Sequence, residues 1–140
     1  MIKITNGYLE QIGGNTLFQD LAKKPFTAKT SYWLARVLSQ LQKEGEIYFA
    51  ERQKLIEKHA KRHEKDGGQG DKTWKKGDIV SDGKNVSLEN AERFVKDMKE
   101  LTEIEIDLGL KKIKFDLDKE PSCTVEEMTL LVPLIEVKED

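Results

Sequence analysis

The chain has 140 residues, 37% of them hydrophobic and 36% charged, and its formal net charge is -2. This size favours one domain, and so dense a charge favours amphipathic helices with solvated outer faces over a thick buried sheet. No run of about 18 apolar residues and no basic-then-apolar start occurs, so we expect neither a membrane span nor a signal peptide.

The first residues predict a short strand followed by an interrupted helix. Isoleucines at positions 2 and 4 alternate with polar residues before Asn6-Gly7, which is typical of a strand that ends in a turn. Apolar residues recur at helical spacing over 8–24, but Gly13-Gly14 interrupts them, so we expect two short helical pieces or one kinked helix. Pro25 ends this stretch, and Thr27 can cap the next helix.

The clearest predicted element is a helix from about Ala28 to about Arg62. An apolar stripe recurs every seven residues at Leu34, Leu41, Tyr48 and Leu55. The other positions of the helix are rich in Lys, Glu, Gln and Arg, which are good helix formers and keep the outer face solvated. The apolar stripe needs a packing partner.

A long connection follows, because residues 64–85 are rich in glycine and poor in apolar residues. Two short stretches, 73–74 and 79–80, flank a turn and predict a small β-hairpin within it. A connection of more than about 15 residues in a compact domain is usually functional or disordered. We therefore interpret residues 64–86 as a flexible or β-hairpin insertion between the two main helices.

The rest of the chain predicts a second long helix, strands and a short final helix. Ser87 is a suitable cap for a helix over 88–101, which we expect to lie antiparallel on the first. The alternating stretches 104–110 and 113–117 predict two strands of one sheet, joined by a hairpin turn or a β-bulge, with residues 2–4 as a candidate third strand. A capping-box pattern at 124–127 opens the final helix.

These elements predict an α+β fold with one domain over residues 1–140. Its parts are a long antiparallel helical hairpin, a small antiparallel β-sheet of two to three strands and a short C-terminal helix.

Two histidines have the spacing of metal ligands. His59 and His63 lie four residues apart on one helix, which allows two imidazoles to reach one zinc ion. Two ligands do not complete a site, and the residues between them lack the glutamate of zinc proteases and add positive charge. We therefore expect histidines at a helix end, and no metal.

The acidic residues of the predicted strands are the candidates for a metal-dependent nuclease. Carboxylates in two rows on paired strands could bind a divalent ion, and the rows here are Glu103, Glu105 and Asp107, then Asp116 and Asp118. We favour the solvated face of a half-buried sheet, with the lysines of residues 111–114 as cross-strand partners.

The single cysteine, Cys123, gives no catalytic site. A helix N-terminus could lower its pKa, but a nucleophile also needs a base, and both histidines are remote in the sequence. One cysteine excludes an internal disulfide and favours a reducing compartment. The sequence therefore predicts no catalytic residue.

A tryptophan within a basic, polar connection is the strongest candidate for a contact residue. Trp74 is flanked by lysines, and large rings dominate interface energetics. One interpretation has the ring packed on its own hairpin, and the other has it contacting a partner. We therefore predict a partner-binding surface made of Trp74, Lys75, Lys76 and Arg62.

Several segments together resemble a known family. They are IKITNG at 2–7, SYWLAR at 31–36, ERQKLIEK at 51–58, EID at 105–107 and LLVPLIE at 130–136. This layout resembles a family of short phage and prophage proteins of unassigned function, often encoded among virion structural genes. The resemblance covers nearly the whole chain and implies no catalytic residues, because none is assigned in the family.

We therefore expect a non-enzymatic, phage-encoded protein–protein interaction protein, a minor virion or assembly component without a cofactor. Its expected partner is a protein or a second copy of the chain, with nucleic acid a weaker candidate and no membrane contact. The alternatives are an inhibitor of a host enzyme or defence system and a metal-dependent nuclease. The expected location is the bacterial host cytoplasm or the virion.

Overall fold

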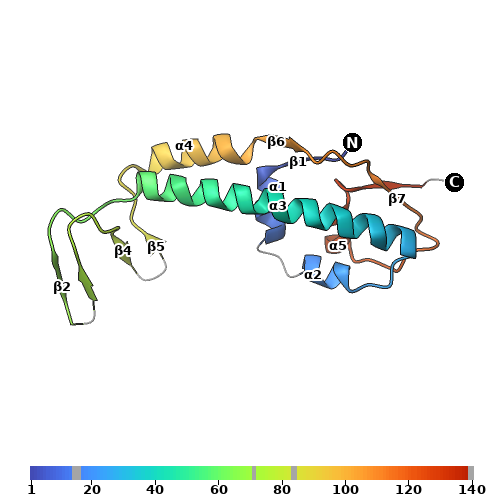
Figure 1. Cartoon of the computed structure of the whole chain (residues 1–140), viewed down its shortest axis with the longest axis horizontal. Helices are drawn as coiled ribbons and strands as arrows, with labels where there is room; N and C mark the ends of the chain where they lie inside the picture. Colours follow the sequence, from blue (N-terminus) through green and yellow to red (C-terminus); the bar gives the residue numbers. More distant parts are fainter. Residues whose placement is uncertain (14–16, 71, 83–84, 139–140) are drawn as a thin grey trace. The chain divides into compact units, whose positions relative to one another are not determined.

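The chain combines helices with short strands (Figure 1), in a computed structural model that describes residues 1–13, 17–70, 72–82 and 85–138. It divides into two compact units: unit 1 is Met1–Tyr48 with Thr102–Asp140, and unit 2 is Phe49–Leu101. The long helix α3 (Ala28–His59) contributes residues to both units. The predicted mixture of helices and small sheets is confirmed.

The N-terminal part of unit 1 contains β1 (Lys3–Thr5), α1 (Asn6–Gly13) and α2 (Leu17–Ala22). The predicted turn at Asn6-Gly7 is wrong, because α1 begins at Asn6 directly after β1. The Thr5 hydroxyl accepts a hydrogen bond from the Tyr8 N–H at 3.2 Å, which caps the helix. The two helical pieces are confirmed, while Gly14 of the predicted interruption lies outside the described residues.

Unit 1 contains two separate two-stranded sheets. β6 (Glu105–Asp107) pairs antiparallel with β1, so the candidate strand at residues 2–4 does share a sheet with the 104–110 strand. β7 (Ile113–Phe115) instead pairs in parallel with β8 (Ile135–Val137), so placing the 104–110 and 113–117 strands in one antiparallel sheet is wrong. Leu134 and Ile135 are buried at 0% and 6% exposure, and Ile135 lies opposite the buried Ile113 of β7 in the strand register.

The core of unit 1 includes the predicted stripe of α3. Leu34, Leu41 and Tyr48 are buried, and so is Val37 between them. The last helix of the unit, α5 (Val125–Leu131), begins with the predicted capping box. Its Leu130 and Leu131 are each 1% exposed, so the cap anchors a helix that contributes to the core.

In unit 2 the chain leaves α3 at His59, three residues before the predicted end. The next residues form β-bridges, with Ala60 opposite Leu88 and Arg62 opposite Ile79. Two hairpins occupy the connection: β2 (Gly67–Gln69) with β3 (Lys72–Trp74), and β4 (Ser81–Asp82) with β5 (Asn85–Val86). The predicted hairpin between 73–74 and 79–80 is wrong, because Trp74 pairs with Gly67.

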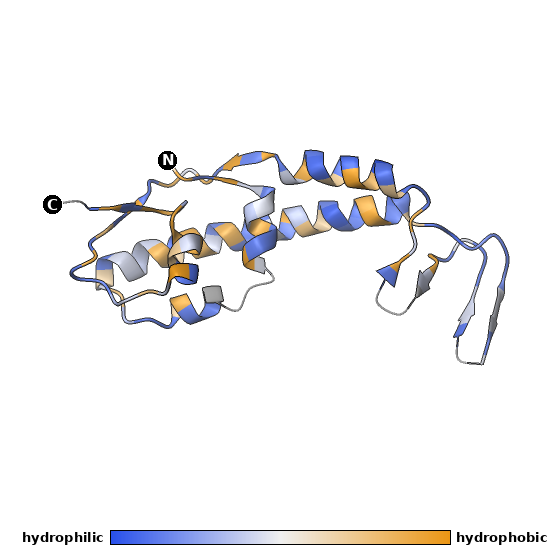
Figure 2. Cartoon of the chain, turned by 180° about the vertical axis from the view of Figure 1, so that it is seen from behind, coloured by the Kyte–Doolittle hydropathy of each residue, from blue (hydrophilic) through white to orange (hydrophobic). Residues whose placement is uncertain are grey.

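The helix α4 (Ala91–Thr102) begins later than predicted. Asn90 caps it, since its side-chain oxygen accepts a hydrogen bond from the Arg93 N–H at 3.1 Å. Ser87 is engaged elsewhere, because its N–H donates to the Val80 carbonyl. Figure 2 shows hydrophilic and hydrophobic residues on different sides of α4. Within the described residues, no helix has both the length and the apolar character that crossing a membrane requires.

Candidate functional site

A pocket of about 580 Å³ in unit 1 is the strongest candidate for a binding site. It is lined by α3 residues between Lys29 and Arg36 and by the segment 109–114, and we call it the basic pocket. Its walls combine charged, aromatic and aliphatic side chains. Ligand sites typically have this mixture of apolar surface with a few polar groups.

The start of α3 positions one wall of the basic pocket. Thr27 caps the helix, its hydroxyl accepting from the Thr30 N–H at 3.4 Å, and Glu120 holds Thr27 through a 2.8 Å bond from the Thr27 N–H. Lys29, Trp33 and Arg36 follow at i, i+4 and i+7, so they share one side of the helix. The buried stripe beside them fixes the rotation of α3 and leaves this side at the surface.

The other wall is held at both ends by main-chain hydrogen bonds. The Ile2 N–H donates to the Leu110 carbonyl at 2.7 Å, and the Ile113 N–H donates to the Leu134 carbonyl at 3.0 Å. The lysines at 111 and 112 lie between these two fixed points and are exposed. Lys114 is exposed as well, because it lies between buried Ile113 and buried Phe115 on the strand.

Five cations line the basic pocket, and none of its described lining residues is acidic. In the described part of the chain none of the five forms an ion pair. They are Lys29, Arg36, Lys111, Lys112 and Lys114. A pocket lined by one sign of charge concentrates the field and attracts the opposite charge.

Aromatic residues lie at the edge of this pocket. Trp33 is 37% exposed and Tyr32 is 58% exposed, and their rings meet edge to face with centroids 5.3 Å apart. The guanidinium of Arg36 lies 5.3 Å from the centroid of a Trp33 ring. This cation–π contact holds the charge of Arg36 beside the indole.

The predicted contact residue Trp74 has partners within its own unit. Its ring stacks on the His63 ring at 4.3 Å between centroids with an interplanar angle of 15°. Its indole N–H donates to the Lys65 carbonyl at 3.1 Å, and its ring lies against Gly67. The ring therefore packs on the hairpin of β2 and β3, as one of the two interpretations proposed.

Arg62 also makes contacts within unit 2. Its guanidinium donates to the Gly77 carbonyl at 3.0 Å and to the Glu57 carbonyl at 3.3 Å. The structure thus brings Arg62 to the turn that contains Lys75 and Lys76, whose exposed side chains extend from it. Their role in partner binding stays a prediction.

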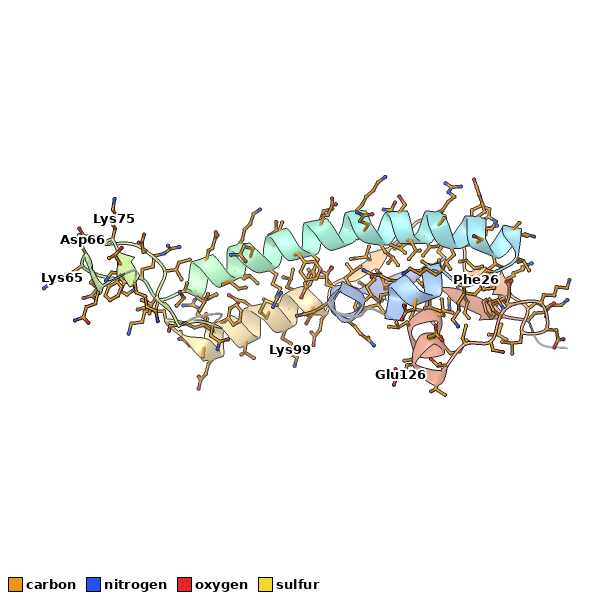
Figure 3. The ribbon with its side chains drawn as sticks, turned by 90° about the horizontal axis from the view of Figure 1, so that it is seen from below. Phe26, Lys65, Asp66, Lys75, Lys99 and Glu126 are labelled. Atoms are coloured by element: carbon orange, nitrogen blue, oxygen red, sulfur yellow. The ribbon has the colours of Figure 1, made fainter. Side chains whose placement is uncertain are left out.

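Backbone amides of this turn are held by two carboxylates. The Lys75 N–H donates to Asp78 at 2.8 Å, and the Lys76 N–H donates to Asp66 at 2.7 Å. Figure 3 labels Lys65, Asp66 and Lys75 in this part of unit 2. Acidic residues therefore lie among the lysines here, in contrast to the basic pocket.

The two histidines have separate contacts. His59 is 7% exposed, its Nε2 lies 2.7 Å from an Asp97 carboxylate oxygen, and its ring meets Phe94 edge to face. The hydrogen bond with His59 lowers the pKa of Asp97. His63 stacks on Trp74 instead. Across residues 1–13, 17–70, 72–82 and 85–138, no group of three His, Cys, Asp or Glu residues could hold a metal ion.

The two predicted carboxylate rows are not on paired strands: Glu105 and Asp107 lie in β6, which pairs with β1, and Asp116 and Asp118 follow β7, which pairs with β8. Glu105 lies 3.8 Å from the Lys3 amine, and Asp116 lies 3.9 Å from the Lys138 amine. The expected cross-strand partners, the lysines of 111–114, line the basic pocket instead. In the described part of the chain these lysines form no ion pair.

Cys123 lies near the start of α5, but its environment opposes the thiolate. Burial and the nearby carboxylate of Glu127 raise the pKa of the thiol. The thiol donates to the Pro121 carbonyl at 3.7 Å. The suggested lowering of its pKa by the helix N-terminus is wrong.

The residues of the basic pocket were not singled out from the sequence, although two signals indicated them. Trp33 lies outside the seven-residue stripe, and three lysines occur in four positions at 111–114 without an acidic residue between them. No protein-family model, curated protein or solved structure matches this chain.

Proposed function

We propose that this chain is a non-enzymatic, phage-encoded protein–protein interaction protein that contacts its partner through the basic pocket of unit 1. The observation that carries the proposal is the pocket itself, where five cations without ion pairs in the described part of the chain surround an exposed indole. Tyrosine, tryptophan and arginine are the residues most enriched at energetically dominant interface positions. All three occur together at the start of α3 as Tyr32, Trp33 and Arg36.

The phage origin and the role as a minor virion or assembly component are supported by the resemblance of the five segments described above. The proposal also includes the long antiparallel helical hairpin of α3 and α4. Within unit 2, the contacts of His59 with Asp97 and Phe94 support it.

Site-specific photo-crosslinking tests the proposed contact surface. A photoreactive p-benzoylphenylalanine is placed at position 33 or 112 in the basic pocket, at position 32 beside it, or at position 72 in unit 2 as the matched control. The full-length proteins are expressed in the bacterial host, and adducts are identified by mass spectrometry. The proposal expects one protein, or a second copy of the chain, to be captured from both pocket positions.

The outcomes separate the two candidate surfaces. Capture from position 72 alone would replace the basic pocket with the surface predicted around Trp74. Lack of any adduct at all four positions, with the protein folded and illuminated, would count against an interaction protein.

A further inference from the structure

We propose that the basic pocket binds an extended acidic segment of a protein, which adds to β7 as a third strand. This inference rests on the proposed function and names the chemistry and the geometry of the partner. Three features support it: an open strand edge, a locally confined positive charge and an aromatic wall.

The open edge follows from the hydrogen bonds of β7. The Ile113 N–H donates to the Leu134 carbonyl at 3.0 Å, and the Phe115 carbonyl accepts from the Lys138 N–H at 2.9 Å. Successive residues of a strand point their main-chain groups to opposite sides, so the N–H and C=O of Lys114 point away from β8. Among the described residues β7 pairs with β8 alone, and Lys114 also lines the pocket.

An open edge of this kind accepts an extended peptide. The peptide backbone then pairs with the free N–H and C=O groups, while its side chains supply specificity. A strand of about five or six residues is the usual length. Nucleic acid has no backbone that could make this ladder, so the edge favours a peptide.

The positive charge of the basic pocket favours an acidic peptide, and the small extent of this charge favours a short one. Five cations line the pocket, whereas the sequence of unit 1 as a whole has 11 Lys and Arg residues against 15 Asp and Glu residues. The positive field is therefore local, and at physiological salt it decays over about 8 Å. A short acidic segment can remain within this field, while a long polyanion would also meet the acidic remainder of the unit.

The aromatic wall explains why the segment should alternate acidic and apolar residues. Side chains of an extended strand point alternately to its two faces. Carboxylates on one face can meet Lys111, Lys112 and Lys114, and apolar side chains on the other can contact the exposed part of Trp33. The proposed partner segment is thus a short run of alternating glutamate or aspartate and valine or isoleucine.

Fluorescence titration tests this proposal with a defined probe. The protein carries Trp74→Phe, so that Trp33 is its only tryptophan, and the probe is an acetylated, amidated peptide of alternating glutamate and valine. The expected result is a saturable change of Trp33 emission. Replacing Lys111, Lys112 and Lys114 with glutamate should weaken binding on the order of 100-fold, since close charge pairs across interfaces couple strongly.

Matched controls separate the charge from the strand pairing. The variant with glutamate at positions 61, 65 and 72 has the same change of charge in unit 2, at exposed lysines outside the predicted surface around Trp74, and should bind as before. A probe N-methylated at alternate residues on its pairing side keeps its charge but loses the N–H groups that would meet the edge. It should bind about fivefold more weakly, because the hydrogen bond to the Lys114 carbonyl is lost.

Each other result overturns the proposal. Equal binding of the two peptides would refute strand addition, and this arm compares both peptides on the same protein with intact lysines, so misfolding of the lysine variant cannot obscure it. Equal or tighter binding of oligothymidine would indicate nucleic acid as the ligand. No binding of the glutamate–valine peptide would refute the acidic segment, whereas the proposed function would still stand if position 33 and position 112 crosslink to a protein.

Discussion

The chain has two tryptophans, Trp33 and Trp74. Both lie near lysines, but the two sites differ in how many contacts the ring and the neighbouring charges make within the protein. In unit 2, Trp74 stacks on His63, donates a hydrogen bond to the Lys65 carbonyl and lies against Gly67. Two carboxylates accept hydrogen bonds from the backbone of the adjacent turn. In unit 1, Trp33 is partly exposed beside five cations that lack ion pairs in the described part of the chain. A basic and aromatic composition is therefore a better candidate for a binding surface where the fold leaves its charges without ion pairs.

The largest effect is expected from Gly68→Ala, which should disrupt the β2–β3 hairpin that holds Trp74. Gly68 has a φ of +114°, and a Cβ there would lie 2.1 Å from the Lys72 carbonyl oxygen. Gly68→Ala should cost roughly 3 kcal/mol or more, which exceeds what a two-stranded hairpin can tolerate. Trypsin should then cleave at Lys72, and peptide binding by unit 1 should persist.

The control for this variant is a glycine without such constraints. Gly45 lies within α3, and an added Cβ would meet nothing within 4 Å. Gly45→Ala should raise the free energy of unfolding by up to about 1 kcal/mol through helix propensity. Equal protease resistance of Gly68→Ala and the unmodified chain would contradict the pairing of β2 with β3.

A second pair of variants sharpens the comparison directly. Trp74→Ala removes a stacked and hydrogen-bonded ring and should lower the free energy of unfolding by roughly 2 kcal/mol, with the loss confined to unit 2. Trp33→Ala should lower the free energy of unfolding by only about 1 kcal/mol, because the partly exposed ring loses its contacts with Tyr32 and Arg36, yet it should weaken peptide binding. Chemical denaturation and fluorescently labelled peptide provide the two measurements. Loss of binding in Trp74→Ala alone would return the site to unit 2.

Local sequence patterns predicted the helices and strands of this fold better than they predicted which strands pair. The stripe of α3 and the capping box of α5 depend on residues close in sequence, and both are confirmed. The parallel pairing of β7 with β8 depends on two segments separated by α5, so alternation within 113–117 indicated a strand but gave no information on its neighbour.

The basic pocket was missed for the same reason. Its two walls, around Trp33 and around Lys112, are far apart in sequence, and each by itself resembles a solvated surface. Trp74 was singled out because its lysines are neighbours in the sequence. The stacking on His63 that engages its ring depends on the path of the hairpin, which the sequence pattern placed elsewhere.

A smaller effect tests whether the two units lose structure separately. Thr124→Ala removes the cap of α5 in unit 1, and Asn90→Ala removes the cap of α4 in unit 2. Each should cost about 1 kcal/mol. Hydrogen exchange should show faster amide exchange around α5 in the first variant and around α4 in the second. Uniform acceleration over both units in either variant would show that they unfold together.

The smallest expected effect is a dependence of folding stability on pH, which arises from a different carboxyl group in each unit. The hydrogen bond with His59 lowers the pKa of Asp97 in unit 2, and the hydrogen bond from the Thr124 backbone lowers the pKa of Glu127 in unit 1. A carboxyl with a lowered pKa in the folded state stabilises the fold above its unfolded pKa, near 4 for these groups. The stabilisation is lost as the pH falls through the lowered value.

Asp97→Asn should therefore reduce the stability of unit 2 at neutral pH, and the difference from the unmodified chain should vanish in strong acid, where both side chains are neutral. Glu127→Gln should do the same in unit 1. Hydrogen exchange measured across an acid titration assigns each loss to its unit. If Asp97→Asn exchanged like the unmodified chain at neutral pH, the 2.7 Å contact with His59 would contribute nothing to stability, and unit 2 would depend on the packing of Trp74 and its hairpin instead.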